Sequence, residues 1–285
     1  MKLEAFISIL ILLTASGTAF GFSSDSGKGA IVKLSGTIQP SSSGSLYSSG
    51  GVSPDRVRSL NDKIESNNYD AVVYEINSGG GTVVASKEIM RDIEEVEVPT
   101  VCRFRDIAAS GAYMIALGCD HVVADPSSIT GSIGVKSSYL EFSGALERYG
   151  LEYVNITSGK NKDIGSPYKN ITQQEKEILK NKAELVHDQF LTQVRQNRNI
   201  SDENFEQVST GTIFLGSEAE EIGLVDELGG REEAFSTAEN ITGKDLEFST
   251  ISQQQSFNIF SLLSADSLIR NILGLSQSPM RASLY

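Results

Sequence analysis

Histidine, cysteine and positive charge are all scarce in this sequence, and each scarcity argues against a class of site. The 285 residues include 2 histidines, 2 cysteines and 24 Lys plus Arg against 37 Asp plus Glu, for a formal net charge of −13. A surface of that sign repels a phosphate backbone, so we expect no nucleic-acid binding. Two cysteines are too few for a disulfide framework, and no histidine or acidic residue flanks them at metal-site spacing.

The cysteines and the histidines carry no recognisable motif. Cys102 falls in a strand pattern and Cys119 follows a helical one, and isolated cysteines in such patterns are usually small buried hydrophobic residues. We therefore expect two unbridged thiols, with a single disulfide in an oxidising compartment as the alternative. A Ser-His-Asp triad would require His121 or His187 to reach a serine. The scarcity of histidine moves the search for a general base to lysine.

An apolar run at the N-terminus sets the expected domain boundaries. It extends from Ala5 to Phe22, after Lys2 and before a Ser/Gly stretch. Its length fits a single-pass membrane anchor, and a cleaved signal peptide is the alternative. Both interpretations place the rest of the chain outside the cytoplasm. We expect an anchor or signal segment at residues 1–27, a folded domain at 28–245, and a tail at 246–285 with an amphipathic stretch at 257–275.

Apolar runs and helical periodicity alternate along the folded part. Val- and Ile-rich runs bounded by turn residues predict strands at 29–38, 71–78, 100–106, 121–125 and 151–157. Helical patterns occupy 54–67, 82–97, 110–118 and 172–198. This alternation predicts an α/β fold of layered sheet and helices with parallel strand pairing. The apolar stripe of the last helix, which includes Val186 and Phe190, is expected to form core or a subunit contact rather than a binding site.

Three consecutive glycines join a predicted strand to a predicted helix. The stretch reads EINSGGGTVVAS at residues 75–86. Glycine lets the backbone turn sharply and bring its N–H groups to a ligand, and the start of a helix adds positive potential. Such a turn can hold a phosphate or an oxyanion, with a purely structural turn as the alternative. The spacing fits neither a dinucleotide-binding fingerprint nor a phosphate-binding loop.

Ser110 stands where a second predicted strand meets a second predicted helix. Its neighbours in DIAASGAY are small, which leaves room for a substrate backbone, and the helix start favours a developing negative charge on the hydroxyl. The alternative is a serine that caps the helix. Ala108 occupies the place of the first glycine of a Gly-X-Ser-X-Gly elbow, so that motif is absent.

Two lysines lie in the loop TSGKNKDIGSPYK at residues 157–169. A lysine amine acts as a general base when burial lowers its pKa enough to leave it neutral. Most loop lysines are solvated surface charges, and the net negative charge of the chain opposes such a shift. From spacing alone, Lys160 and Lys162 are therefore both weak candidates.

Together these stretches resemble a known family. INSGGG, AASGAY, SSITGSIGV, SGKNKDIGSPY and GTIFLGSEAEEIGLVDELGG, in that order, look like the signal peptide peptidase A family of serine/lysine peptidases in its short, single-domain form. The resemblance covers roughly residues 28–245. It implies a Clp-protease/crotonase-like α/β fold of layered β-sheets flanked by helices. It also implies a membrane anchor, a catalytic domain outside the cytoplasm and a dome-like homo-oligomer with internal active sites.

The resemblance further assigns catalytic roles to residues of this chain. The family's nucleophile falls on Ser110 and its general base on Lys162, the lysine of NKDIGSP, with Lys160 as the less favoured choice. Ser132, in TGSIGV, is similar to the hydroxyl that orients the lysine. The implied activity is that of a serine endopeptidase that needs no metal and no organic cofactor.

In the same resemblance the glycine turn supplies the oxyanion hole, chiefly through Gly81, with Gly80 beside it. Gly79 stands where the family has proline, which loosens the turn. The substrates would be membrane-derived peptides such as signal-peptide remnants.

Two alternatives to a peptidase stay open. One is a crotonase-like acyl-CoA enzyme, in which the glycine turn stabilises an enolate or a thioester oxyanion. The other is a catalytically idle membrane scaffold on a Clp-like fold. Export from the cytoplasm argues against the first because coenzyme A is cytoplasmic, and the presence of both Ser110 and Lys162 argues against the second.

Overall fold

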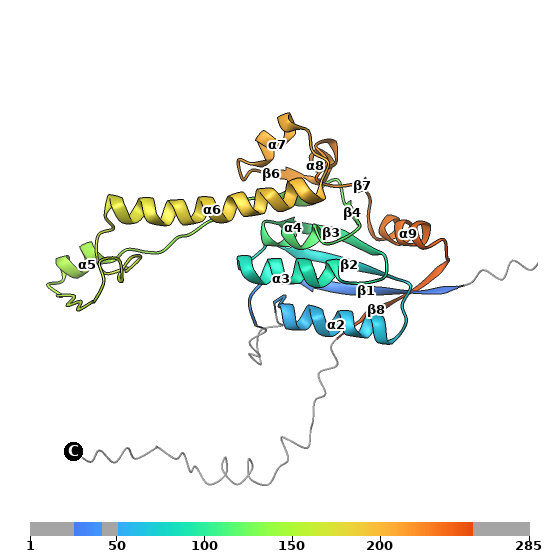
Figure 1. Cartoon of the computed structure of the whole chain (residues 1–285), viewed down its shortest axis with the longest axis horizontal. Coiled ribbons are helices and arrows are strands. Elements are labelled where there is room, and N and C mark those ends of the chain that lie inside the picture. The colour runs from blue at the N-terminus through green and yellow to red at the C-terminus, as the bar shows by residue number, and fades with distance from the viewer. Residues whose placement is uncertain (1–25, 42–50, 253–285) are drawn as a thin grey trace, which may run out of the picture. The chain divides into compact units, whose positions relative to one another are not determined.

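A computed structural model describes residues 26–41 and 51–252 of the chain. Strands and helices alternate through most of this range (Figure 1). The strands are β1 Gly27–Ser35, β2 Ala71–Ser78, β3 Thr100–Ala109, β4 His121–Ala124, β5 Ile129–Gly131, β6 Ile213–Leu215, β7 Glu227–Leu228 and β8 Leu246–Ile251. The helices are α2 Pro54–Ser66, α3 Val83–Glu94, α4 Gly111–Ala116, α5 Ser143–Arg148, α6 Gln173–Asn197, α7 Asp202–Val208, α8 Gly216–Glu221 and α9 Arg231–Thr242.

The described strands form one mixed sheet, with β3, β2 and β1 at its centre. The order is β6-β5-β3-β2-β1-β8, and β4 pairs with β3 and with β7. Every pair is parallel except β5 with β6. The predicted α/β class and parallel pairing are confirmed. Because β2 and β3 are parallel neighbours, the turns that follow them lie at the same edge of the sheet.

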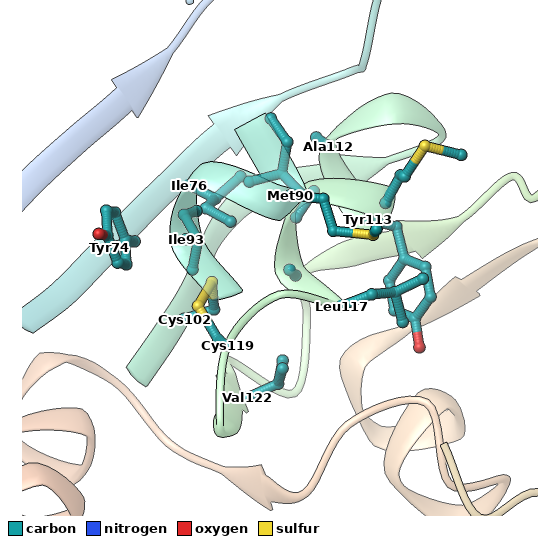
Figure 2. Close-up of a cluster of buried hydrophobic side chains, with 14 of the residues drawn as sticks. Tyr74, Ile76, Met90, Ile93, Cys102, Ala112, Tyr113, Leu117, Cys119 and Val122 are labelled. Atoms are coloured by element: carbon teal, nitrogen blue, oxygen red, sulfur yellow. A yellow bond between two sulfur atoms is a disulfide. The ribbon is translucent and has the colours of Figure 1, made fainter. Parts of the chain in front are cut away.

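The two faces of the sheet have different cores, as the period of two along a strand requires. Val72, Tyr74 and Ile76 of β2 belong to the larger cluster, which includes buried residues of α2, α3 and α4. Figure 2 shows part of this cluster, with residues of β2, α3 and α4. Ala71 and Val73 belong to a smaller cluster that contains residues of α9. Each central strand is therefore covered on both faces, which explains why it reads as a continuous apolar run.

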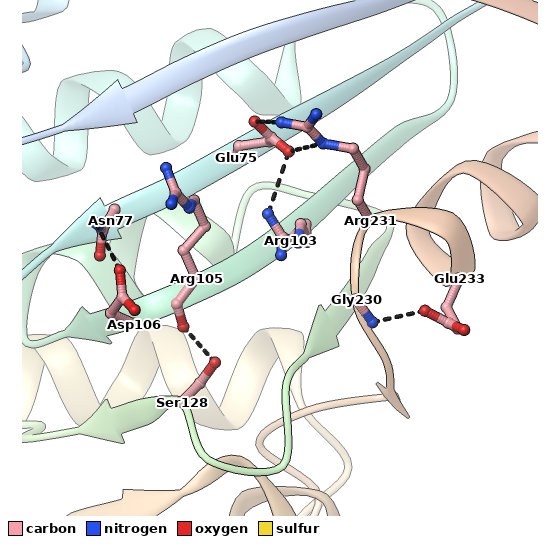
Figure 3. Close-up of polar contacts among 9 residues, drawn as sticks. All are labelled: Glu75, Asn77, Arg103, Arg105, Asp106, Ser128, Gly230, Arg231 and Glu233. Atoms are coloured by element: carbon pink, nitrogen blue, oxygen red, sulfur yellow. Dashed lines mark hydrogen bonds and ion pairs between the residues drawn. The ribbon is translucent and has the colours of Figure 1, made fainter.

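One carboxylate breaks that run on the α9 face. Glu75 of β2 is 1% exposed and bonds Arg231 through both carboxylate oxygens, at 2.7 and 2.8 Å (Figure 3). Arg103 of β3 donates a further bond of 3.2 Å. Burial alone would raise the pKa of Glu75, but the bond and charge of Arg231, together with Arg103, outweigh it and hold the pKa below its usual value. The cluster thereby joins α9 to the two central strands.

The expectation of two unbridged thiols is wrong. Cys102 in β3 and Cys119 just after α4 form a disulfide in the larger cluster, with Cα atoms 5.8 Å apart (Figure 2). Spacing could not reveal the pairing because it depends on α4 folding back onto β3. The bridge closes the segment of chain that contains Ser110.

Two further differences concern strands. Residues 151–157, predicted as a strand, have no regular structure, and Leu151, Val154 and Ile156 are exposed. No strand of the described chain pairs with them. In contrast, residues 246–251, assigned to the tail, form β8 and pair with β1. The sheet therefore extends past the expected boundary at 245.

The apolar run at 5–22 and the amphipathic stretch at 257–275 lie outside the described residues. Within the residues that are described, no helix is long and apolar enough to cross a membrane.

We predict that breaking the Cys102–Cys119 bridge lowers stability. The double substitution Cys102→Ala/Cys119→Ala should reduce the free energy of unfolding by about 3 kcal/mol, because a loop of 17 residues is no longer closed in the unfolded chain. Urea denaturation of the wild type with and without reductant provides the control. Equal midpoints for the oxidised wild type and the double variant would contradict the prediction.

We also predict a pH-dependent contribution from Glu75. Because its pKa is lowered on folding, the contribution is complete above the ordinary glutamate value of 4.5 and is lost as the pH falls through the folded value. Glu75→Gln should cost about 3 kcal/mol at pH 7 because it leaves two arginines without their carboxylate. The difference from wild type, measured by urea denaturation, should shrink below pH 4.5. A difference that is constant from pH 7 to pH 3 would count against the ion cluster.

Candidate active site

Ser110 occupies a strained turn between β3 and α4. Its backbone has φ 56° and ψ −123°, a conformation that costs a non-glycine residue about 1–3 kcal/mol and that persists where surrounding structure enforces it. Its N–H donates to the carbonyl of Gly131 at 2.8 Å. Its side chain makes no capping hydrogen bond. Ser110 therefore occupies the N-cap position of α4, but its hydroxyl does not cap the helix.

Helix α4 fixes the position of this turn. The Met114 N–H donates to the Ser110 carbonyl at 3.0 Å, and the buried Tyr113 hydroxyl donates to the Leu224 carbonyl at 2.9 Å. Burial raises the pKa of Tyr113, so the phenol stays neutral and keeps this bond. Because the helix is anchored in the core, the serine at its start has little freedom to relax.

The glycine turn after β2 packs directly against Ser110. Gly80 has φ +97°, and a Cβ on it would lie 2.7 Å from the Gly111 nitrogen and 3.0 Å from the Ser110 Cβ. A Cβ on Gly81 would overlap the carbonyl oxygen of Ile38. Both positions therefore exclude any side chain. The close approach follows from the pairing of β2 with β3, in which Ser78 lies opposite Ala108.

Two backbone N–H groups at this contact have no acceptor among the described residues, those of Gly81 and Gly111. A Cβ on Gly111 would lie 3.2 Å from the Gly81 nitrogen, so the two glycines are close together. The N–H of Gly80, expected beside Gly81, instead donates to the Ser78 hydroxyl at 3.1 Å. Sequence reasoning missed Gly111, although the residue after a nucleophilic serine often supplies such an N–H.

A cavity of about 160 Å³ opens beside the serine. Ser110, Gly81 and Gly111 line it together with Val83, Met114, Val135, Lys136, Val186 and Phe190. Val186 and Phe190 come from α6. Phe190 is buried in the larger core cluster, as expected of the α6 stripe, and both residues also line this cavity, which was not expected. An apolar stripe on a helix has the same sequence pattern whether it packs in a core or lines a cavity. The sequence therefore could not indicate that these two residues line the cavity.

Lys162 does not line this cavity, and no contact between it and Ser110 occurs in the described part of the chain. It is exposed in a series of turns between α5 and α6, where its N–H donates to the Gly159 carbonyl at 3.1 Å. In Figure 1, α5 lies beside the N-terminal end of α6, whereas α4 lies beside the C-terminal half. Lys160 is exposed in the same loop.

The carboxylates around Lys162 are occupied by another lysine. Lys169 contacts Asp163 at 2.9 Å and Glu175 at 2.6 Å. The bond to Glu175, followed by the bond to Asp163, raises the pKa of Lys169. Asn155 donates to the same Asp163 carboxylate at 3.1 Å. These contacts fix the Lys162 loop to the start of α6 and leave Lys162 without an ion-pair partner among the described residues.

Ser132 lies one residue past Gly131, the acceptor of the Ser110 N–H, and has φ 51°. Its own N–H donates to the Thr212 carbonyl at 2.7 Å. The structure thus brings Ser132 to the same sheet edge as Ser110. Neither histidine lines the cavity: His121 contacts Glu227 at 3.5 Å, and His187 lies on α6.

The described residues contain no group of three His, Cys, Asp or Glu side chains that could hold a metal ion.

Comparison with known proteins identifies the family. The sequence profile of peptidase family S49 matches residues 93–245, which include Ser110 and the Lys162 loop. A Synechocystis sp. protein named "Putative protease slr0021" is 35% identical over 223 residues, covering 75% of this chain and 80% of that protein. The chain belongs to peptidase family S49.

Further relatives are consistent with this assignment. The "Putative signal peptide peptidase SppA" of Enterococcus faecium is 33% identical to this S49 chain over 211 residues, and the match covers 72% of this chain but 61% of that relative. A solved 1510-N membrane-bound stomatin-specific protease, a lysine-to-alanine mutant in complex with a substrate peptide, has a TM-score of 0.51 at 14% identity. The match covers 84% of this chain and 98% of the chain of that protease. At that identity the match shows the shared fold alone.

We predict that the glycine turn tolerates a methyl group at one position and not at another. Gly79→Ala should be nearly neutral, because its Cβ would lie 3.7 Å from the Ile107 Cδ1 atom, an ordinary contact. Gly81→Ala should displace the turn from the Ile38 carbonyl. If the Gly81 N–H binds the oxyanion, the substitution should lower kcat for a peptide substrate by about 100-fold or more. Peptide hydrolysis by the two folded variants checks the prediction. Equal activities would contradict it.

Proposed function

We propose that this S49 protein is a serine endopeptidase in which Ser110 is the nucleophile. The observation that carries the proposal is the strained Ser110, whose hydroxyl makes no capping bond. Ser110 lines one cavity with Gly81 and Gly111, whose N–H groups have no acceptor among the described residues. Such N–H groups stabilise an oxyanion when they are fixed before the reaction begins. The rigid packing of the glycine turn against the serine supports that role.

The proposed mechanism is acyl transfer with lysine as the general base. Neutral Lys162 takes the hydroxyl proton as the Ser110 oxygen attacks the peptide carbonyl, and the tetrahedral oxyanion accepts bonds from the two glycine N–H groups. The lysine then gives its proton to the leaving amine, which leaves an ester on Ser110. Water hydrolyses the ester with the lysine again as base. Ser132, at the same sheet edge, is proposed to orient the lysine; no metal or organic cofactor enters any step.

We propose that Lys162 reaches Ser110 from a second copy of the chain. Three observations support this. Lys162 is exposed and lacks an ion-pair partner among the described residues, and it does not line the Ser110 cavity of its own chain. Its loop is fixed to α6 by Lys169. In the adjoining segment 151–157, Leu151, Val154 and Ile156 are exposed, and a group of exposed apolar side chains is typical of a protein–protein interface. A homo-oligomer would bury that segment and complete the site.

The cavity suggests the class of substrate. Its volume of about 160 Å³ and its Val, Met and Phe lining suit a medium-sized apolar side chain next to the scissile bond. Remnant signal peptides and other unfolded, apolar peptides have such side chains. We further propose that the chain is anchored by its N-terminal run with a Clp/crotonase-like peptidase domain outside the cytoplasm. The Cys102–Cys119 disulfide supports that location, because disulfides persist in oxidising compartments.

The first test is hydrolysis of a fluorogenic apolar peptide by the full chain. Wild type should cleave it, and Ser110→Ala and Lys162→Ala should each lower kcat/KM by about 1000-fold or more, because each removes one member of the dyad. Lys160→Ala is the matched control and should retain activity. Unchanged hydrolysis by Ser110→Ala would refute the proposed nucleophile, and loss in Lys160→Ala with none in Lys162→Ala would assign the base to the other lysine.

A second test asks whether the dyad spans two copies. Ser110→Ala and Lys162→Ala are each expected to be inactive alone, but an oligomer mixed from both variants contains pairs in which an intact serine meets an intact lysine. Co-expression or mixing after reversible dissociation should restore a substantial fraction of wild-type activity, measured with the same peptide. No recovery in verified mixed oligomers would place both residues of the dyad in one chain.

A further inference from the structure

Lys136 is the charged side chain of the Ser110 cavity. It follows Gly134 and Val135 after β5, and all three residues line the cavity. The rest of the lining consists of glycine, serine and apolar side chains, with no carboxylate. Lys136 is exposed, and no carboxylate or hydrogen-bond acceptor contacts it within the described part of the chain.

Lys136 differs in this respect from two lysines that are held against α6. The chain carries 37 acidic residues against 24 basic ones, and both of those lysines have side-chain partners. Lys169 contacts Asp163 and Glu175, and Lys87 donates to Gln189 at 2.6 Å. A lysine in a small, mostly apolar cavity loses part of its hydration when a peptide fills the space, and a carboxylate on that peptide would replace it.

We propose that Lys136 determines substrate specificity by binding a carboxylate of the peptide close to the scissile bond. This inference rests on the proposed peptidase function of the cavity. The carboxylate can belong to an acidic side chain or to the free C-terminus of a peptide, and the two sources present the same chemistry to the lysine. The apolar walls take the neighbouring part of the peptide, so the site selects an apolar residue with a carboxylate beside it.

A role as general base would have different consequences. A base is required for every substrate, so replacing Lys136 by methionine would abolish hydrolysis of neutral and acidic peptides alike. A specificity residue affects the acidic peptide alone. Methionine keeps the length and the apolar stem of lysine, and Lys136→Met therefore separates the charge from the packing.

The experiment compares kcat/KM for matched peptides with the full-length wild type, Lys136→Met and Lys136→Glu. One pair of peptides differs by Glu against Gln beside the scissile bond, and a second pair ends in a free carboxylate or an amide near that bond. Wild type should prefer one or both carboxylate peptides by about three- to fivefold, the range of a partly exposed ion pair. Lys136→Met should lose the preference while it retains activity on the neutral peptides, and Lys136→Glu should reverse it.

Lys182→Glu, which changes the charge of an exposed lysine on α6 by the same amount, should keep the wild-type preference. The pair that shows the effect identifies the side chain or the C-terminus as the source. Equal preferences in wild type and Lys136→Glu, or loss of all hydrolysis in a folded Lys136→Met, would overturn the inference. If none of the peptides is cleaved in a way that requires Ser110, the proposed peptidase function is refuted instead. Including Ser110→Ala in the same series therefore separates failure of the specificity proposal from failure of the proposed function.

Discussion

The contact between the glycine turn and Ser110 is the constraint on which the candidate site depends. A Cβ on Gly80 would lie 2.9 Å from the Ala109 carbonyl and 2.7 Å from the Gly111 nitrogen, so two backbones meet with no side chain between them. This approach brings Gly81 and Gly111 close together, and among the described residues neither N–H has an acceptor. Ser110, at the same contact, has a positive φ.

The sheet produces that contact through ordinary parallel pairing. β2 and β3 are neighbours, and the turns after their carboxyl ends must meet at one edge. β5 adds Gly131 and Ser132 at the same edge, because Gly131 pairs with Ala109. On the opposite face, Glu75 with its two arginines joins β2, β3 and α9. The disulfide closes the chain around the serine turn. The central strands, the ion cluster and the disulfide thus all support the elements that carry the site.

The sequence predicted what depends on local pattern and missed what depends on packing at a distance. The α/β class, the central strands and the glycine turn follow from periodicity and from adjacent glycines. The N–H of Gly111 was missed because almost every residue has a backbone N–H. What distinguishes this one is that Gly81 lies close to it in the folded chain. The disulfide depends on how α4 folds over β3. The contribution of Val186 and Phe190 to the cavity lining depends on where α6 crosses the cavity. Segment 151–157 has the pattern of a strand, but no strand among residues 26–41 and 51–252 pairs with it.

The proposed function depends on an activated Ser110 hydroxyl. The most direct test is to treat the full-length protein with a fluorophosphonate, digest it, and locate the adduct by mass spectrometry. We expect a single adduct on the peptide that contains Ser110, with none on the peptide that contains Ser132. An adduct on another serine, or none in protein that cleaves a peptide, would contradict it.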